Sequence, residues 1–172
     1  MMLALCLLLV SCGSKTHDKQ TIKEIAHSHN CITMDEFCEL KYSYVFEKKL
    51  PCLVYLDELH VWDIVSNIDD LRYVVGDSDE EDEENYVYVD PCWIGEPTKR
   101  NNECWIKSWI AFRQYIGLDK TQVEWVLSKT KSSRTIYTPI IIKIYQVGCS
   151  PETFSGSFIS YKADLVAILN EE

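Results

Sequence analysis

A histidine between carboxylates is the first group in this chain that could do chemistry. His60 follows Asp57 and Glu58 and precedes Asp63. Histidine is a general base near neutral pH, and an adjacent carboxylate orients the ring and stabilises its charged form. The pattern makes Glu58, His60 and Asp63 the candidate catalytic residues of a hydrolase.

The sequence does not mark a nucleophile for this cluster. It contains neither Gly-x-Ser-x-Gly nor His-Glu-x-x-His, the local signatures of serine hydrolases and zinc proteases. Paired carboxylates can cleave glycosidic bonds without a local motif. A hydrolase is therefore an alternative, and the simpler interpretation is that the charged residues form the rim of a strand turn.

Three potential metal ligands, His27, His29 and Cys31, stand at alternate positions. Only an extended segment would place all three on one side. The flanking sequence is typical of a helix end, so we expect no metal there. We expect no cofactor elsewhere in the chain.

Six cysteines follow residue 12 and form an even set. In an oxidising compartment they allow three disulfides in 15 connectivities. Cys92 and Cys104 enclose a segment rich in turn-forming residues, which favours a bridge between them; buried free thiols are the alternative. No Cys-x-x-Cys pair indicates structural zinc. The candidates for disulfide bonds are Cys31, Cys38, Cys52, Cys92, Cys104 and Cys149.

The first residues of the chain indicate export. Residues 3–10 are apolar and lead into Ser11 and Cys12, followed by a polar segment. As a helix, this run would be roughly 12 Å long, far shorter than the ~30 Å hydrocarbon layer of a membrane. It is typical of the apolar region of a signal peptide.

The segment Leu9-Val10-Ser11-Cys12 resembles the lipobox of bacterial lipoproteins. The resemblance implies a signal peptide over 1–11, a lipidated Cys12 with a short tether over 12–17, and one domain over 18–172. It also implies an acylated membrane anchor. Gly13 is not acidic, which favours the outer membrane over the inner one. The alternatives are an ordinary secretory signal and an apolar element of the mature fold.

The net charge of −10 is mostly local. The run over residues 77–84 holds seven of the 27 acidic residues, which leaves 20 acidic against 17 basic residues elsewhere. The rest of the domain is close to neutral and has no basic stripe. Nucleic acid is therefore not an expected partner.

The acidic run lies between two strand-like patterns, over 71–75 and 86–89, so we expect it at the tip of a hairpin. It lacks the glycine and the glutamate that an EF-hand needs at its sixth and twelfth positions. A solvated loop is the simplest interpretation. If the tip binds a cation or a basic partner, the candidate residues are Asp79, Glu81 and Glu83.

Aromatic residues are concentrated in the third quarter of the chain. Trp105, Trp109 and Trp125 are most simply core residues. Trp93 is harder to bury beside a cysteine-bounded loop, so together with the basic residues Lys99 and Arg100 it is a candidate contact surface for a protein or a glycan.

The elements that position these residues indicate an α+β domain. An apolar stripe at helical spacing predicts a helix from Trp105 to Ile116 that ends at Gly117. Asp119 and Gln122 predict a capping box and a second helix that ends near residue 129. A first helix is expected over 18–26. Strands are expected over 42–46, 52–56, 60–65, 71–75, 86–89, 140–147, 154–159 and, less distinctly from a helix, 161–169.

We therefore expect an antiparallel sheet with two consecutive helices packed on one face, stapled by disulfides. The expected function is that of a lipid-anchored, non-enzymatic binding module for a protein or a glycan. The alternatives are an envelope hydrolase that uses residues 57–63 and a secreted eukaryotic or viral interaction protein without lipid.

Overall fold

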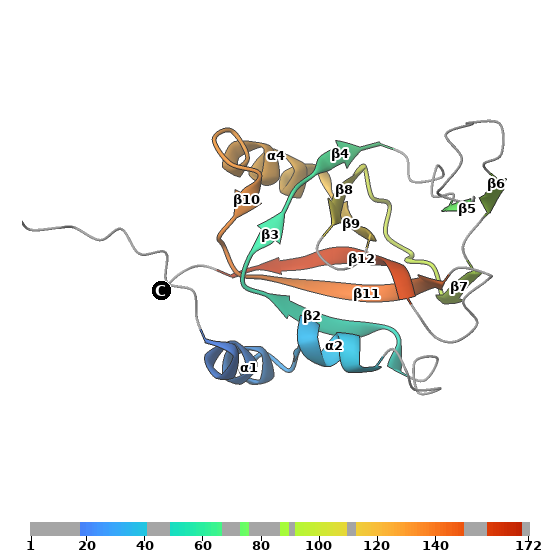
Figure 1. The fold of residues 1–172 in the computed structure, drawn as a ribbon. Coiled ribbons are helices and arrows are strands. Elements are labelled where there is room, and N and C mark those ends of the chain that lie inside the picture. The colour runs from blue at the N-terminus through green and yellow to red at the C-terminus, as the bar shows by residue number, and fades with distance from the viewer. Residues whose placement is uncertain are drawn as a thin grey trace, which may run out of the picture.

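The structure is a computed structural model that describes residues 18–40, 49–66, 73–75, 87–89, 92–109, 113–149 and 158–169. Cys12 and its signal, the predicted strand over 42–46 and the acidic run lie outside these ranges. The described helices are α1 (Lys19–Ser28), α2 (Met34–Leu40) and α4 (Lys120–Lys129) (Figure 1). None of them combines the length and the apolar character needed to cross a membrane.

Most strands belong to one mixed sheet. Its order is β1-β2-β11-β12-β9-β8-β4, and β7 also pairs with β11. The β1–β2 and β12–β9 pairs are parallel, and the other pairs are antiparallel. The strands are β1 (Ile32–Thr33), β2 (Cys52–Leu56), β4 (Asp63–Val65), β7 (Cys92–Gly95), β8 (Cys104–Trp109), β9 (Arg113–Leu118), β11 (Ile140–Cys149) and β12 (Phe158–Ile168).

Two small ribbons complete the described strands. In the first, β3 (Leu59–His60) pairs with β10 (Thr135–Ile136). In the second, β5 (Tyr73–Val75) pairs antiparallel with β6 (Val87–Val89), which confirms the strand pair predicted on either side of the acidic run.

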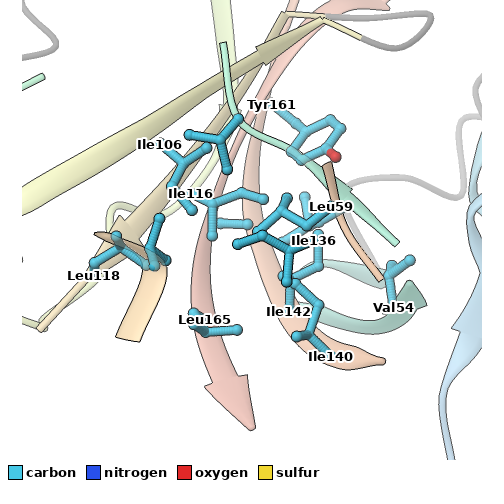
Figure 2. Close-up of a cluster of buried hydrophobic side chains, with 14 of the residues drawn as sticks. Val54, Leu59, Ile106, Ile116, Leu118, Ile136, Ile140, Ile142, Tyr161 and Leu165 are labelled. Carbon is cyan, nitrogen blue, oxygen red and sulfur yellow. The ribbon is translucent and has the colours of Figure 1, made fainter. Parts of the chain in front are cut away.

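The main core lies on one face of the sheet and is centred on β11. Ile142 pairs with Val54 on one neighbouring strand and with Leu165 on the other, and all three side chains are fully buried. Figure 2 shows these residues in one cluster with side chains from β8, β9 and the β3–β10 ribbon. Each fully buried side chain of this kind contributes roughly 1.5–3 kcal/mol, which makes this cluster the main source of stability.

The helices cover both faces of the sheet, which corrects the prediction of one covered face. Phe37 of α2 and Val126 of α4 are buried in the main core. Ala26 of α1 belongs to a second cluster with Tyr55 and Ile141. Because successive side chains of a strand lie on opposite faces, this second cluster lies across the sheet from the first.

A capping box that was not predicted begins α2. Thr33 Oγ1 accepts a hydrogen bond from the Glu36 backbone N–H, and Glu36 accepts one from the Thr33 backbone N–H. The latter bond is the main reason that the pKa of Glu36 falls to about 2; Lys23 and His27 of α1 also lower it. α1 ends at Ser28 with His29 as its C-cap, which confirms the predicted helix end in this segment. The His27 imidazole faces the Glu36 carboxylate.

The predicted helix from Trp105 to Ile116 is wrong. Residues 104–109 and 113–118 are the antiparallel strands β8 and β9. Ile106 and Ile116 are fully buried register partners, whereas Trp105 is only partly buried. In β8 the buried Ile106 and Ser108 alternate with the partly buried Trp105 and Lys107, so a period of two describes this strand and the helical stripe does not.

The second predicted helix is confirmed as α4. The Asp119 side chain accepts a hydrogen bond from the Gln122 backbone N–H at 2.9 Å, and the Gln122 side chain accepts one from the Asp119 backbone N–H at 2.9 Å. The helix ends at Lys129, as predicted. Trp125 packs partly buried against the main core.

Most of the other predicted elements within the described residues are confirmed. The helix over 18–26 is α1, and the strands over 52–56 and 140–147 are β2 and β11. The predicted strand over 60–65 is divided between β3 and β4. Residues 161–168 form the major part of β12, so the ambiguity over 161–169 is resolved in favour of a strand.

The structure does not support the predicted disulfide staple. Cys31, Cys38, Cys52 and Cys104 are free thiols. Burial raises the pKa of the Cys52 thiol to about 11, which disfavours its reactive thiolate form. The favoured bridge between residues 92 and 104 would join β7 to β8, but β7 pairs with β11, and β8 pairs with β4 and β9.

Candidate functional site on the β3 and β10 ribbon

The β3–β10 ribbon carries the histidine that the sequence singles out. His60 stands opposite Thr135 in the antiparallel register, and Leu59 stands opposite Ile136. Leu59 and Ile136 are buried in the main core. The ribbon lies between α4 and the strands β11 and β12 in Figure 1. Its apolar residues thus fix the ribbon to the core, and alternation places the His60 and Thr135 side chains on its other side.

His60 links a carboxylate to a hydroxyl. Its Nε2 lies 3.3 Å from Glu58 Oε1, and its Nδ1 lies 2.9 Å from Thr135 Oγ1. The side chains of His60 and Glu58 are 43% and 39% exposed, so solutes can reach them. A hydroxyl, an imidazole and a carboxylate in series have the connectivity that activates a hydroxyl nucleophile.

The structure brings together only part of the predicted catalytic cluster. Glu58 contacts His60, but Asp63 is exposed on β4, where its Oδ1 accepts a hydrogen bond from the Ile64 backbone N–H at 2.8 Å. Asp57 is partly buried. The pKa of Tyr55 is raised mainly by the burial of its own side chain and, to a smaller extent, by the negative charge of Asp57. Thr135 was not predicted, because it is distant in sequence and has no local motif.

Two strongly exposed aromatic side chains flank this group. Trp62 is 66% exposed and Tyr137 is 61% exposed. They follow His60 and Thr135, respectively, by two residues, just beyond the ends of β3 and β10. The guanidinium carbon of Arg134 lies 5.6 Å from the centroid of the Trp62 ring, a cation–π contact.

We call this group the ribbon surface. It combines apolar rings, a cation and a histidine–carboxylate pair, which together can bind a ligand with both apolar and charged parts. The sequence alone indicated Glu58 and His60 of this surface. It did not indicate that Trp62 and Tyr137 are exposed, because their exposure depends on how the ribbon packs against the core. The ribbon surface consists of Glu58, His60, Trp62, Arg134, Thr135 and Tyr137.

The other predicted contact surface, around Trp93, has partners within the protein. Lys162 Nζ lies 4.2 Å from the centroid of the partly buried Trp93 ring. Arg100 donates to the Leu165 carbonyl at 2.7 Å and to Asp119 Oδ2 at 2.7 Å. Lys99 is exposed. Arg100 therefore connects this segment to β12 and to the start of α4.

A buried carboxylate anchors the same segment. Asp164 of β12 is 6% exposed and accepts hydrogen bonds from Thr98 Oγ1 at 2.6 Å and from Asn102 Nδ2 at 2.8 Å. Gly117 makes room for Asn102, because a Cβ at residue 117 would lie 2.2 Å from the Asn102 amide nitrogen. We call residues 96–103 the anchored loop, since three of its side chains bond to the sheet.

The described residues contain no group of three or more histidine, cysteine or acidic side chains that could hold a metal ion. Cys12 and the acidic candidates Asp79, Glu81 and Glu83 lie outside the described residues. The structure therefore places the ribbon surface and the anchored loop, and leaves the anchor and the acidic tip as predictions from sequence.

No family model, curated protein or solved structure shows significant similarity to this chain.

Proposed function

We propose that this protein is an exported, lipid-anchored binding protein whose ribbon surface recognises a protein or a glycan. The observation that carries the proposal is the exposure of Trp62 and Tyr137 next to the ends of the ribbon that bears His60, with Arg134 against the Trp62 ring. Aromatic side chains and arginine are the residues that most often dominate binding energy when a partner buries them. Aromatic rings also stack on the apolar faces of sugars.

The binding experiment compares surface variants of the anchored protein. Wild type, a Trp62→Ala/Tyr137→Ala double variant and a Leu127→Ala control are recovered from the membranes of cells that express them, and the bound molecule is identified and quantified. Leu127 is a suitable control because it is 51% exposed but lies on α4. We expect at least a tenfold loss of bound partner in the double variant only.

An unchanged amount of partner on the double variant would contradict the proposed surface. An equal loss in the double variant and in Leu127→Ala would contradict it as well, because the effect would then not be local. Circular dichroism of each purified variant checks that the fold is intact.

The proposed anchor is a lipid on Cys12 at the membrane of a bacterial envelope, with the outer membrane favoured. Metabolic labelling with a palmitate analogue tests it: wild type should take up the label, and Cys12→Ala should not. Labelled Cys12→Ala would contradict the anchor. Unlabelled wild type that is released into the medium would instead support the alternative of a secreted eukaryotic or viral protein.

A second candidate function is hydrolysis of an ester, and the contacts of His60 with Thr135 and Glu58 favour it. In such a reaction Thr135 Oγ1 attacks the ester carbonyl while His60 accepts its proton. The leaving alcohol takes that proton, and water then releases the acyl group from Thr135. This candidate develops the alternative that the sequence raised and adds the missing nucleophile.

The ester hypothesis is tested with p-nitrophenyl acetate. Thr135→Val and His60→Gln should each abolish hydrolysis, and mass spectrometry should detect acetyl on Thr135. His27→Gln is the matched control, because His27 Nε2 also faces a carboxylate, that of Glu36, at 3.1 Å. Equal hydrolysis by wild type and Thr135→Val would exclude the hydroxyl as the nucleophile.

A further inference from the structure

The turn that joins α4 to β10 is basic. Lys129 ends α4, and Lys131 and Arg134 follow it before β10 begins. All three residues are exposed. From residue 125 to residue 149 the sequence contains no aspartate or glutamate, although the whole chain has a net charge of −10. We call residues 129–134 the basic turn, since it concentrates positive charge on an acidic protein.

The cations of the basic turn are available to a ligand. Among the described residues, the ion pairs involve Lys19, Lys23, Arg100 and two histidines, and none includes a side chain of the basic turn. Arg134 instead contacts the Trp62 ring. An exposed cation without an internal carboxylate partner keeps its full attraction for an anion. The basic turn therefore favours a negatively charged ligand.

Hydrogen bonds hold the basic turn against the ribbon. The Arg134 carbonyl oxygen accepts a hydrogen bond from the Val61 backbone N–H at 2.7 Å. Ser133 Oγ accepts one from the Thr135 backbone N–H at 3.0 Å. Lys131 is three residues from Arg134, so their Cα atoms are at most about 11 Å apart. In Figure 1 the turn lies between α4 and β10. The basic turn thus continues the ribbon surface, and Arg134 belongs to both.

We propose that the ribbon surface and the basic turn together bind an acidic polysaccharide. Trp62 and Tyr137 stack on sugar rings, and the cations of the basic turn bind the acidic groups of the polymer. This inference rests on the proposed function, because it assigns a class of ligand to the same surface.

The polar groups of the ribbon favour a polysaccharide over a membrane. His60 contacts Glu58 through one ring nitrogen and Thr135 through the other. These groups can exchange hydrogen bonds with sugar hydroxyls, whereas the hydrocarbon of a bilayer offers them no partner, and burying polar groups without partners is costly. The exposed rings favour a sugar over an acidic peptide, because a polymer that offers only charges leaves the rings without a surface to stack on.

Three matched polymers test the inference on the purified full-length protein. Polygalacturonate has sugar rings and carboxylates, dextran has sugar rings without charge, and poly-L-glutamate has carboxylates without sugar rings. Biolayer interferometry measures the binding of each polymer to the immobilised protein. We expect polygalacturonate to bind roughly tenfold or more tightly than either of the other two, and its affinity should fall as salt is added.

Paired lysine substitutions locate the site. Lys129→Gln/Lys131→Gln should weaken the binding of polygalacturonate about tenfold. Lys99→Gln/Lys143→Gln is the matched control, because both lysines are exposed and the net charge changes equally; its affinity should stay within about twofold of wild type. Lys131→Gln alone should weaken binding about threefold. This single variant leaves α4 intact, whose last turn a cation at residue 129 stabilises.

Three outcomes would overturn the inference. Equal binding of poly-L-glutamate and polygalacturonate would show that charge alone is recognised. Binding of phosphatidylglycerol vesicles without binding of polygalacturonate would assign the surface to a membrane. Equal losses in the two double lysine variants would show that the effect is not local to the basic turn.

Failure of this inference is distinguishable from failure of the proposed function. If Trp62→Ala/Tyr137→Ala loses the partner recovered from membranes and Lys129→Gln/Lys131→Gln retains it, the ribbon surface stands as the binding site and the acidic class of ligand is wrong. If both double variants retain the partner, both proposals are wrong.

Discussion

The anchored loop and the ribbon surface are built from similar residues, but the side chains of the first are bonded within the protein and those of the second are exposed. Each brings together a tryptophan, a cation and a carboxylate. Around the anchored loop, Lys162 covers Trp93 and Asp164 is buried with two hydrogen-bond donors. On the ribbon, Trp62 and the Glu58–His60 pair are exposed. The contrast shows that residue type alone does not distinguish a contact surface from an internal anchor.

The difference arises from the elements against which each segment packs. The anchored loop folds back over β12 and the start of α4, so its polar side chains replace water with backbone and side-chain partners. The ribbon has only its inner side against the core. Its outer side chains therefore keep their access to solvent and to a partner.

The largest expected effect is on the anchored loop. Asp164→Ala leaves the Thr98 hydroxyl and the Asn102 amide without their acceptor, so the free energy of unfolding should fall by about 3 kcal/mol. Urea denaturation measures it. Asp63→Ala, which removes an exposed carboxylate, is the control and should change stability by less than about 0.5 kcal/mol. Equal effects of the two substitutions would contradict the internal role of Asp164.

Gly117→Ala should have the next largest effect. The added methyl group collides with Asn102, whose amide is held by Asp164. We expect a loss of about 2 kcal/mol in urea denaturation. The double variant Gly117→Ala/Asp164→Ala should lose less than the sum of the two single losses, because both substitutions disrupt the same contact. Additive losses would argue that Asn102 does not couple the two positions.

Asp119→Ala tests the junction of the anchored loop with α4. The substitution removes the helix cap and the partner of Arg100, and should cost about 1 kcal/mol. Thermal unfolding should show a decrease of a few degrees. Asp119→Asn keeps the cap but not the ion pair, so it should recover most of the loss; a full loss in Asp119→Asn would assign the stability to the ion pair.

The smallest effect on stability is expected on the ribbon. Arg134→Ala removes an exposed cation from the Trp62 ring and should change the free energy of unfolding by less than about 0.5 kcal/mol. The same variant should bind the partner more weakly. A loss of 2 kcal/mol or more in stability would mean that the ribbon, like the anchored loop, is an internal contact.

Local signals in the sequence predicted elements well. Asp119 and Gln122 identify the start of α4, and Thr33 and Glu36 carry the same kind of signal for α2. The segment from Trp105 to Ile116 has a helical period, but its described residues belong to the paired antiparallel strands β8 and β9. Its β-branched and aromatic residues also suit strands, and pairing with β4 and β12 decided between the two.

The candidate site was only half predictable. Glu58 and His60 are two residues apart, and their proximity follows from sequence alone. Thr135 reaches His60 only because β10 pairs with β3, and the partners of the anchored loop depend on long-range contacts with β12.

Hydrogen–deuterium exchange of the full chain, with and without the partner recovered from the membrane, tests the central claim most directly. The account predicts that the partner slows exchange in peptides covering residues 58–62 and 133–137 and leaves residues 96–103 unchanged. Slowed exchange at 96–103 with no change on the ribbon would contradict it.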